Sequence, residues 1–179
     1  MRVINIFDEI NQETGKEILE KIMQYTIENQ QVLEENEYII YEYESRLEPI
    51  TVNICCNGGS AYHGFAIIDA LRDTGSKIIT KAFGQVASMG LGIFLVGDER
   101  LAGKNTSFLF HGCVGASEGN VPTITQYVNE LQEINEKFKN LMYEQGCTME
   151  EDLLDHYINN GLDFSFDYET AKRYNIVTE

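Results

Sequence analysis

The stretch that decides the fold is residues 78–96, which read IITKAFGQVASMGLGIFLV. Residues 78–83 are rich in β-branched side chains and predict a strand, while the apolar run at 91–96 suits a buried helix. Between them lies the glycine-flanked segment 84–90, which predicts a tight connection. A strand that passes through a tight turn into a helix is a basic unit of α/β folds.

The same alternation continues on both sides of this stretch. Short apolar runs predict further strands at residues 3–6, 50–55 and 107–111. Apolar side chains at helical spacing predict helices at residues 12–31, 61–72, 123–145 and 168–174. Thr148 and Glu151 have the spacing of a capping box and predict the start of one more helix. Strands that alternate with helices predict an α/β fold with a mostly parallel sheet.

The composition limits what this chain does. Its 179 residues predict a single domain over 1–179, and the formal net charge of −16 argues against binding to nucleic acid or an anionic membrane. The opening residues do not resemble a signal peptide, and no run of roughly 18 apolar residues occurs, so we expect a cytoplasmic protein.

The cysteines carry no metal or redox pattern. They are Cys55, Cys56, Cys113 and Cys147, and none forms a C-x-x-C pair. This spacing argues against a zinc site, and we expect neither a metal nor a cofactor. Cys55 and Cys56 lie inside an apolar run, where we expect both as small buried side chains.

Two glycine-containing turns carry the candidate chemistry. Residues 57–60 read NGGS and residues 84–90 read GQVASMG, and each turn lies between a predicted strand and a predicted helix. Backbone N–H groups at a helix N-terminus attract negative charge. Ser88 in the second turn therefore has surroundings that suit acyl transfer, in which a tetrahedral intermediate carries a negative oxygen. Taken by itself, the local sequence is better explained by an ordinary turn before a helix.

The second turn closely resembles the nucleophile segment of the Clp proteolytic subunit family, which reads GQAASMG. Three further segments are similar to that family, in the same order along the chain. They are the turn 58–60, the strand 107–111 that ends in His111, and residues 163–177, which begin with Asp163. The spacing from Gly59 to Ser88 also matches the family without a gap.

This resemblance implies a Ser-His-Asp triad made of Ser88, His111 and Asp163. Ser88 would be the nucleophile, His111 its general base, and Asp163 the group that orients the imidazole. The backbone N–H groups of Gly59 and Met89 would form the oxyanion hole. The implied activity is that of a serine endopeptidase that cleaves peptides or unfolded proteins inside an oligomeric chamber.

Other residues compete for these roles. His63 and His156 are better explained as surface residues, because neither stands in a matching serine-containing context. Ser60 and Asp167 each precede a predicted helix, and we interpret both as N-caps. Asp163 is therefore preferred over Asp167 as the third member of the triad.

The resemblance also implies an architecture and partners. The family fold, related to that of the crotonases, is built of repeated β-β-α units with a protruding handle helix, and the handle region here would be about residues 112–146. Relative to the family, the acidic, tyrosine-rich residues 30–48 form an insertion, in which residues 38–41 can add a strand. Subunits would assemble into a heptameric ring or a double ring. An ATPase unfoldase partner stays open, because the first predicted strand begins almost at Met1, where the family carries an axial segment.

Several positions depart from the family pattern. Asn57 replaces the proline usual before the double glycine, Ser107 stands where an arginine is frequent, and Gly161-Leu162 replaces an Asp-Arg pair that links two rings. We therefore expect a divergent member whose double ring is weaker, single or built differently. Residues 115–120 resemble the glycine-rich segment before the handle, where an extended strand could bind a peptide edge-on.

Two other functions fit part of the pattern. A crotonase-like acyl-CoA enzyme shares the related fold and an oxyanion hole, but it does not need Ser88, His111 and Asp163 together. A ring or assembly subunit that does not cut has no reason to keep all three residues. The peptidase is therefore the leading hypothesis.

Overall fold

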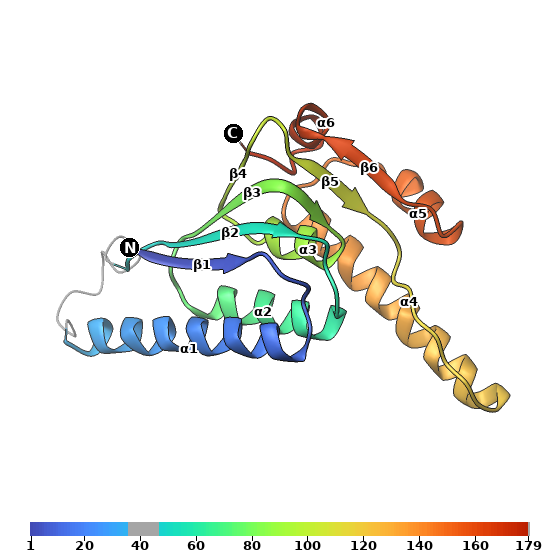
Figure 1. Ribbon diagram of the computed structural model, residues 1–179, viewed down its shortest axis with the longest axis horizontal. Coiled ribbons are helices and arrows are strands. Elements are labelled where there is room, and N and C mark those ends of the chain that lie inside the picture. Colours follow the sequence, from blue (N-terminus) through green and yellow to red (C-terminus); the bar gives the residue numbers. More distant parts are fainter. Residues whose placement is uncertain (36–46, 179) are drawn as a thin grey trace.

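The apolar runs of the chain form a sheet whose central strands are parallel, as the computed structural model shows for residues 1–35 and 47–178 (Figure 1). The described strands are β1 (Arg2–Ile6), β2 (Ile50–Cys56), β3 (Ile78–Ala87), β4 (Glu99–Ala102), β5 (Ser107–Phe110) and β6 (Phe164–Asp167). They follow the order β1-β2-β3-β5-β6, and β4 also pairs with β3. Only β6 runs antiparallel to its neighbour among these strands. The predicted α/β fold with a parallel-rich sheet is confirmed.

The helices connect these strands. They are α1 (Gln12–Glu35), α2 (Ala61–Asp73), α3 (Met89–Leu95), α4 (Val121–Glu144), α5 (Glu151–Asn159) and α6 (Tyr168–Arg173). Helices α1 and α2 lie together along one side of the sheet, and the long helix α4 projects away from the body (Figure 1). Helix α4 corresponds to the predicted handle helix, within two residues at its start.

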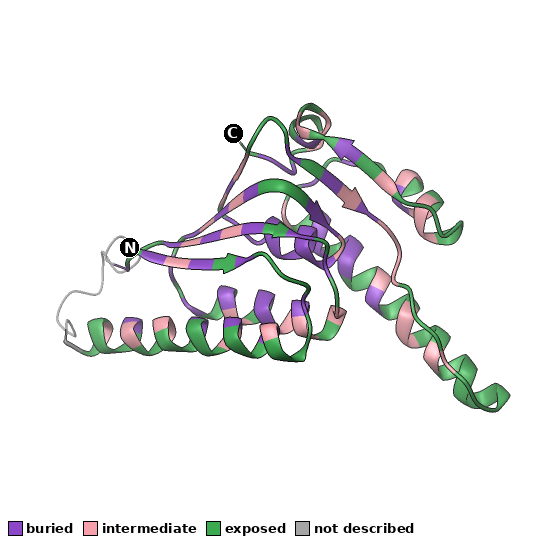
Figure 2. Ribbon diagram, viewed as in Figure 1, coloured by how far each residue is buried: buried purple, intermediate pink, exposed green. Residues whose placement is uncertain are grey.

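The core lies between the sheet and helices α2 and α3. Side chains alternate along a strand, so every second residue of β1 and β2 points inward. These residues are buried together with the apolar face of α2: Ile4, Ile6, Val52, Ile54, Ile67, Ile68 and Leu71. All seven residues of α3 are buried, whereas the outer half of α4 is exposed (Figure 2). Burial of each such aliphatic side chain contributes about 1.5–3 kcal/mol, which fixes α3 beneath β3.

The expected tight connection at residues 84–90 is wrong in its first half. Strand β3 continues through it to Ala87. It does so because β3 changes partner along its length, pairing first with β4 through residues 79–82 and then with β5 through 85–87. Gly84 lies between the two pairings with a φ of 60°, a conformation that glycine adopts without strain.

Two smaller predictions also fail. Cys55 is exposed and only Cys56 is buried, because neighbouring residues of β2 face opposite sides of the sheet. The N-cap of α5 is Glu150, without a side-chain capping bond, so Thr148 and Glu151 form no capping box. The Thr148 amide instead donates to the Tyr174 carbonyl at 3.0 Å, which ties this loop to the C-terminal segment.

The predicted insertion at residues 30–48 lies only partly within the described chain. Its first residues extend α1 to Glu35, and the added strand expected at 38–41 lies outside the described residues. In the part of the chain that the structure describes, no helix combines the length and the apolarity needed to cross a bilayer.

Arg100 in β4 joins the end of the chain to the sheet. The guanidinium is buried, with the residue 5% exposed, and donates to four backbone carbonyls. The acceptors are those of Gly97, Gln145, Asn175 and Ile176, at 2.8–3.2 Å. A buried cation is tolerated there because its donors are met by acceptors from three segments.

Replacing Arg100 by methionine should therefore destabilise the fold. We expect the free energy of unfolding of Arg100→Met to fall by about 3 kcal/mol, because several buried carbonyls lose their donor at once. Chemical denaturation measures this. The exposed Lys104, as Lys104→Met, is the control and should stay within about 0.5 kcal/mol of wild type. A fall of less than about 1 kcal/mol in the free energy of unfolding of Arg100→Met contradicts this structural role of Arg100.

Candidate active site

Three neighbouring strands meet at one edge of the sheet, and a reactive side chain stands at each strand end. Ser88 follows β3, His111 follows β5, and Asp163 precedes β6. Strand β5 lies between the other two: it pairs in parallel with β3, ending at Ala87↔Leu109, and antiparallel with β6, ending at Phe110↔Phe164. One further residue along each strand therefore brings Ser88, His111 and Asp163 to the same edge.

Ser88 occupies a strained turn. Its φ of 52° and ψ of −126° are a backbone conformation that residues other than glycine rarely adopt. The Ser88 amide donates to the Leu109 carbonyl at 2.9 Å, so the backbone of the turn is fixed to the strand that carries His111. Ser88 is the N-cap of α3, yet its side chain makes no capping bond. The half-buried hydroxyl is thus left available for chemistry.

The turn at Gly58 and Gly59 closes over Ser88. A Cβ at Gly58 would lie 2.6 Å from the Ser88 Cβ and 3.0 Å from the Met89 amide nitrogen, so this approach requires glycine. The φ values, 98° at Gly58 and 137° at Gly59, also favour glycine at both positions. The double glycine is therefore explained by two close contacts, of Gly58 with the serine turn and of Gly59 with the Ile10 backbone.

Hydrogen bonds hold the glycine turn in place from the N-terminal side. The Ile10 amide donates to the Gly58 carbonyl at 2.8 Å, and the Ser60 amide donates to the Ile10 carbonyl at 2.7 Å. The Gly58 amide donates to the Cys56 sulfur at 3.2 Å, and burial raises the pKa of the Cys56 thiol, which keeps it protonated. The thiol in turn donates to the Asp8 carbonyl at 3.0 Å.

Two backbone N–H groups remain available beside Ser88. Among the described residues the Gly59 amide has no hydrogen-bond acceptor, since the bridge to Ile10 uses the residues on either side of it. Met89 is the first residue of α3, so its amide has no acceptor within the helix. Both residues line the same pocket as Ser88. Two such donors beside a serine hydroxyl are what an oxyanion requires.

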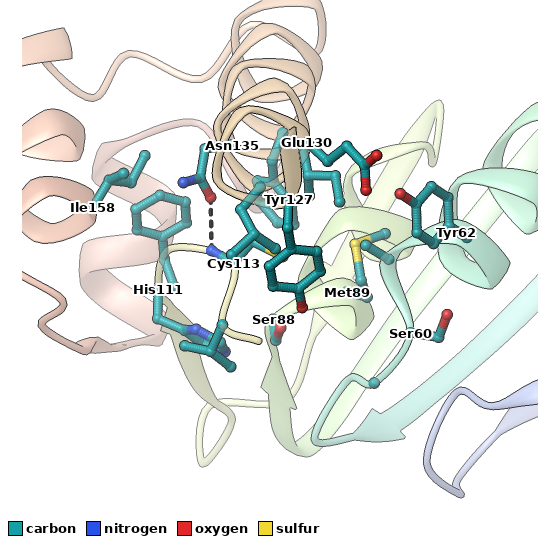
Figure 3. A pocket seen from close by; sticks show the side chains of 17 residues that line it. Ser60, Tyr62, Ser88, Met89, His111, Cys113, Tyr127, Glu130, Asn135 and Ile158 are labelled. Carbon is teal, nitrogen blue, oxygen red and sulfur yellow. Dashed lines mark hydrogen bonds between the residues drawn. The ribbon is translucent and has the colours of Figure 1, made fainter. Parts of the chain in front are cut away.

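The pocket itself is mostly apolar. It has a volume of about 340 Å³ and is lined by Ser88 and His111 at one end and by the α4 side chains Leu131, Ile134 and Phe138 (Figure 3). Asp163 does not line it. An apolar wall next to a serine and an imidazole suits the binding of an extended chain with an apolar side chain.

The His111 ring is held by a backbone group. Its Nδ1 lies 2.6 Å from the Gly112 carbonyl oxygen. In the part of the chain that the structure describes, no hydrogen bond links His111 to Ser88 or to Asp163, which is exposed. The structure therefore brings Ser88, His111, Gly59 and Met89 into one pocket, and it leaves Asp163 at the same sheet edge without a bond to the imidazole.

The comparison with known proteins decides the family. The model of the Clp protease family matches residues 1–179. This chain belongs to the Clp protease family. Curated relatives agree. The chain is 29% identical over 138 residues to the ATP-dependent Clp protease proteolytic subunit 2 of Borreliella burgdorferi, a match that covers 74% of this chain and 66% of the relative.

Two further members of the Clp protease family show the same degree of similarity. The proteolytic subunit 2 of Treponema denticola is 29% identical over 140 residues, covering 77% of this chain and 64% of the relative. The proteolytic subunit 2 of Pseudomonas aeruginosa is 30% identical over 135 residues, covering 74% of this chain and 65% of the relative. The matches thus span less than two thirds of the length of these curated relatives.

The competing residues of this Clp protease family member are explained by other roles or positions, although Ser60 also lines the pocket. Asp167 caps α6 by accepting from the Thr170 amide at 2.9 Å, which lowers the pKa of its carboxyl, so the predicted N-cap is confirmed. Ser60 caps α2, also as predicted, and lies 2.9 Å from His63 Nδ1. His63 and the exposed His156 do not line the pocket of Ser88 and His111.

Two features of the site had no signal in the sequence. Asn135 on α4 accepts a hydrogen bond from the Cys113 amide, and the Gly112 carbonyl holds His111. Both depend on how α4 packs beside residues 111–115, which local patterns do not encode. Within residues 1–35 and 47–178, no group of three or more His, Cys, Asp or Glu side chains could hold a metal ion.

The contact between Gly58 and the Ser88 turn gives a prediction on stability. Gly58→Ala should lower the free energy of unfolding by about 2–5 kcal/mol, from a positive φ and a clash with Ser88 together. Gly161→Ala is the matched control, because Gly161 has a φ of 60° and nothing within 4 Å of its added Cβ. It should cost only about 1–2 kcal/mol. Equal losses in denaturant titrations would remove the steric argument.

Proposed function

We propose that this member of the Clp protease family is a serine-type endopeptidase in which Ser88 is the nucleophile and His111 the general base. The observation that carries the proposal is that both side chains line one pocket together with the available amides of Gly59 and Met89. Asp163 is the third member of the proposed triad. Its support is the β5–β6 register, whose next pair would be His111 and Asp163.

The geometry suggests how the reaction proceeds. His111 accepts the Ser88 proton as the hydroxyl oxygen attacks the scissile carbonyl. The carbonyl oxygen becomes negative and is stabilised by the N–H groups of Gly59 and Met89, near the N-terminus of α3. The tetrahedral intermediate then collapses, His111 gives its proton to the leaving amine, and water releases the acyl group by the same steps in reverse.

The proposed substrates are peptides or unfolded proteins, bound in an extended conformation. Residues 111–120 form neither helix nor strand in the structure and run beside α4, so their backbone groups can pair with an added chain. The apolar pocket wall of Leu131, Ile134 and Phe138 would accept one substrate side chain. Main-chain pairing with a single apolar pocket gives affinity with little sequence selectivity.

The proposed assembly is a homo-oligomeric ring. Helix α4 carries exposed apolar residues toward its free end, with Val121, Ile124 and Val128 exposed by 77%, 40% and 45%. Such a row on a protruding helix favours contact with other subunits. A closed ring would also keep the active sites away from folded proteins. The relatives are named ATP-dependent, and for this chain an ATPase partner belongs to the same proposal.

The alternative is a subunit that assembles without cutting, and labelling separates it from the peptidase. We expect an activity-based fluorophosphonate probe to label wild type and not Ser88→Ala, because the probe reacts only with an activated serine. Ser165→Ala, an exposed serine on β6, should label like wild type. Equal labelling of wild type and Ser88→Ala rejects the peptidase.

His111→Ala should lower peptide turnover by roughly 10³–10⁶-fold, because Ser88 then lacks its general base.

The assembly has its own test. Under native conditions, mass spectrometry or sedimentation should find a particle of several subunits, each of 20.4 kDa. Val128→Asp, which places a charge on the apolar row of α4, should weaken it by disfavouring burial of that surface. Glu133→Asp, an exposed change on the same helix, should leave the particle intact. A fully active monomer would defeat the chamber proposal.

A further inference from the structure

Two hydrogen bonds meet at the peptide group between Gly112 and Cys113. On one side, the Cys113 amide donates to Asn135 Oδ1 at 2.6 Å, a contact drawn in Figure 3. On the other side, the Gly112 carbonyl oxygen lies 2.6 Å from His111 Nδ1. The described chain has no cis peptide bonds, so the N–H and C=O of this group point in opposite directions. Asn135 therefore sets the direction in which the carbonyl faces His111.

We propose that Asn135 is a positioning residue that acts through the Gly112–Cys113 peptide group to hold His111 in the tautomer required of a general base. This rests on the proposed peptidase function. A carbonyl oxygen can only accept a hydrogen bond, so Nδ1 must carry the proton. The neutral ring then has its lone pair on Nε2, the nitrogen that can take the Ser88 proton.

The surroundings of the peptide group are built to fix it. A Cβ at Gly112 would lie 3.3 Å from the Ile158 Cα of α5, so the backbone is held closely against that helix. Asn135 is half-buried on α4, next to the buried Ile134. An amide that donates also polarises its own carbonyl, which becomes a better acceptor for His111.

The contact with the Gly112 carbonyl shares with Asp163 the task of a triad carboxylate, which is to fix the tautomer of the imidazole. Asp163 is exposed and makes no hydrogen bond to His111. The other titratable groups that line the pocket of His111 are Tyr62, Cys113, Tyr127 and Glu130, and the strand register adds Asp163. Because the Gly112 carbonyl already selects the tautomer, removing the Asp163 carboxylate should cost less than the roughly 10⁴-fold loss known for a triad aspartate.

The test compares four variants of the full chain with a fluorogenic peptide. Asn135→Leu removes the acceptor at similar size, Asn135→Asp keeps an acceptor oxygen, and Asp163→Asn removes the carboxylate charge. Asn140→Leu, at an exposed position of the same helix, is the control. We expect kcat to fall by roughly 10–100-fold in Asn135→Leu, as for a displaced catalytic group, and to stay within about threefold in Asn135→Asp and Asn140→Leu.

The pH profile separates positioning from a loss of structure. A bond from Nδ1–H is stronger when the ring is charged, so a Gly112 carbonyl that is free to turn away from Nδ1 favours the neutral imidazole. The acid limb of the kcat/KM profile should therefore move to lower pH in Asn135→Leu. In Asp163→Asn the acid limb of the kcat/KM profile should stay in place, and kcat/KM should fall by about tenfold or less. The proposal is overturned if Asp163→Asn loses about 10⁴-fold while Asn135→Leu matches wild type.

A readout without turnover keeps this inference separate from the peptidase proposal. Nitrogen NMR of ¹⁵N-histidine protein, with His63→Gln and His156→Gln to leave one signal, reports which ring nitrogen of His111 is protonated. We expect the Nδ1–H form in wild type and a mixture of tautomers in Asn135→Leu. The same tautomer in both overturns the positioning role of Asn135, whereas absent labelling at Ser88 with an intact tautomer difference overturns only the peptidase.

Discussion

The pairing of β5 with β3 on one side and with β6 on the other is the constraint on which the site depends. Each strand contributes one reactive residue just beyond its end, and only this register brings them to a common edge. A slip of one residue would turn every side chain of β5 to the opposite face of the sheet. The hydrogen bond from the Ser88 amide to the Leu109 carbonyl fixes the same register through the backbone, so the positions of Ser88 and His111 follow from the sheet.

The second requirement is a close approach of two turns. The serine turn and the glycine turn come from strands β3 and β2, which are parallel neighbours, and both lead into helices. Parallel strands end at the same edge, so their following turns meet there. The absence of a side chain at Gly58 lets its backbone approach the Ser88 turn, and the absence of one at Gly59 lets its backbone approach Ile10. These approaches leave the amides of Gly59 and Met89 in the pocket of Ser88, where the proposed oxyanion hole needs them.

Much of this could be predicted from the sequence, because strand and helix patterns and two short turns carry strong local signals. The family, the parallel-rich fold and the buried helix after Ser88 follow from residues 78–96 and the matching segments. Strand β3 was underestimated because Gly84 looks like a turn, whereas its role is to let one strand pair with two partners. Cys55 was misplaced because an apolar run does not tell which face each residue takes.

The orientation of the Gly112–Cys113 peptide group, whose carbonyl contacts His111, could not be predicted, because it depends on packing between distant segments. Asn135 stands 22 residues after the amide it binds, and the contact exists only because α4 runs back along residues 111–115. Asp163 shows the opposite case. Its place at the sheet edge follows from sequence similarity and register, but neither tells which acceptor the imidazole selects.

The buried Arg100 has a consequence for how the chain is made. Its guanidinium donates to the carbonyls of residues 175 and 176, which are synthesised about 75 residues after Arg100 itself. Until then the guanidinium lacks two of its four acceptors and stays partly hydrated. Burial of this cation therefore couples closure of this corner of the sheet to the docking of residues 175 and 176.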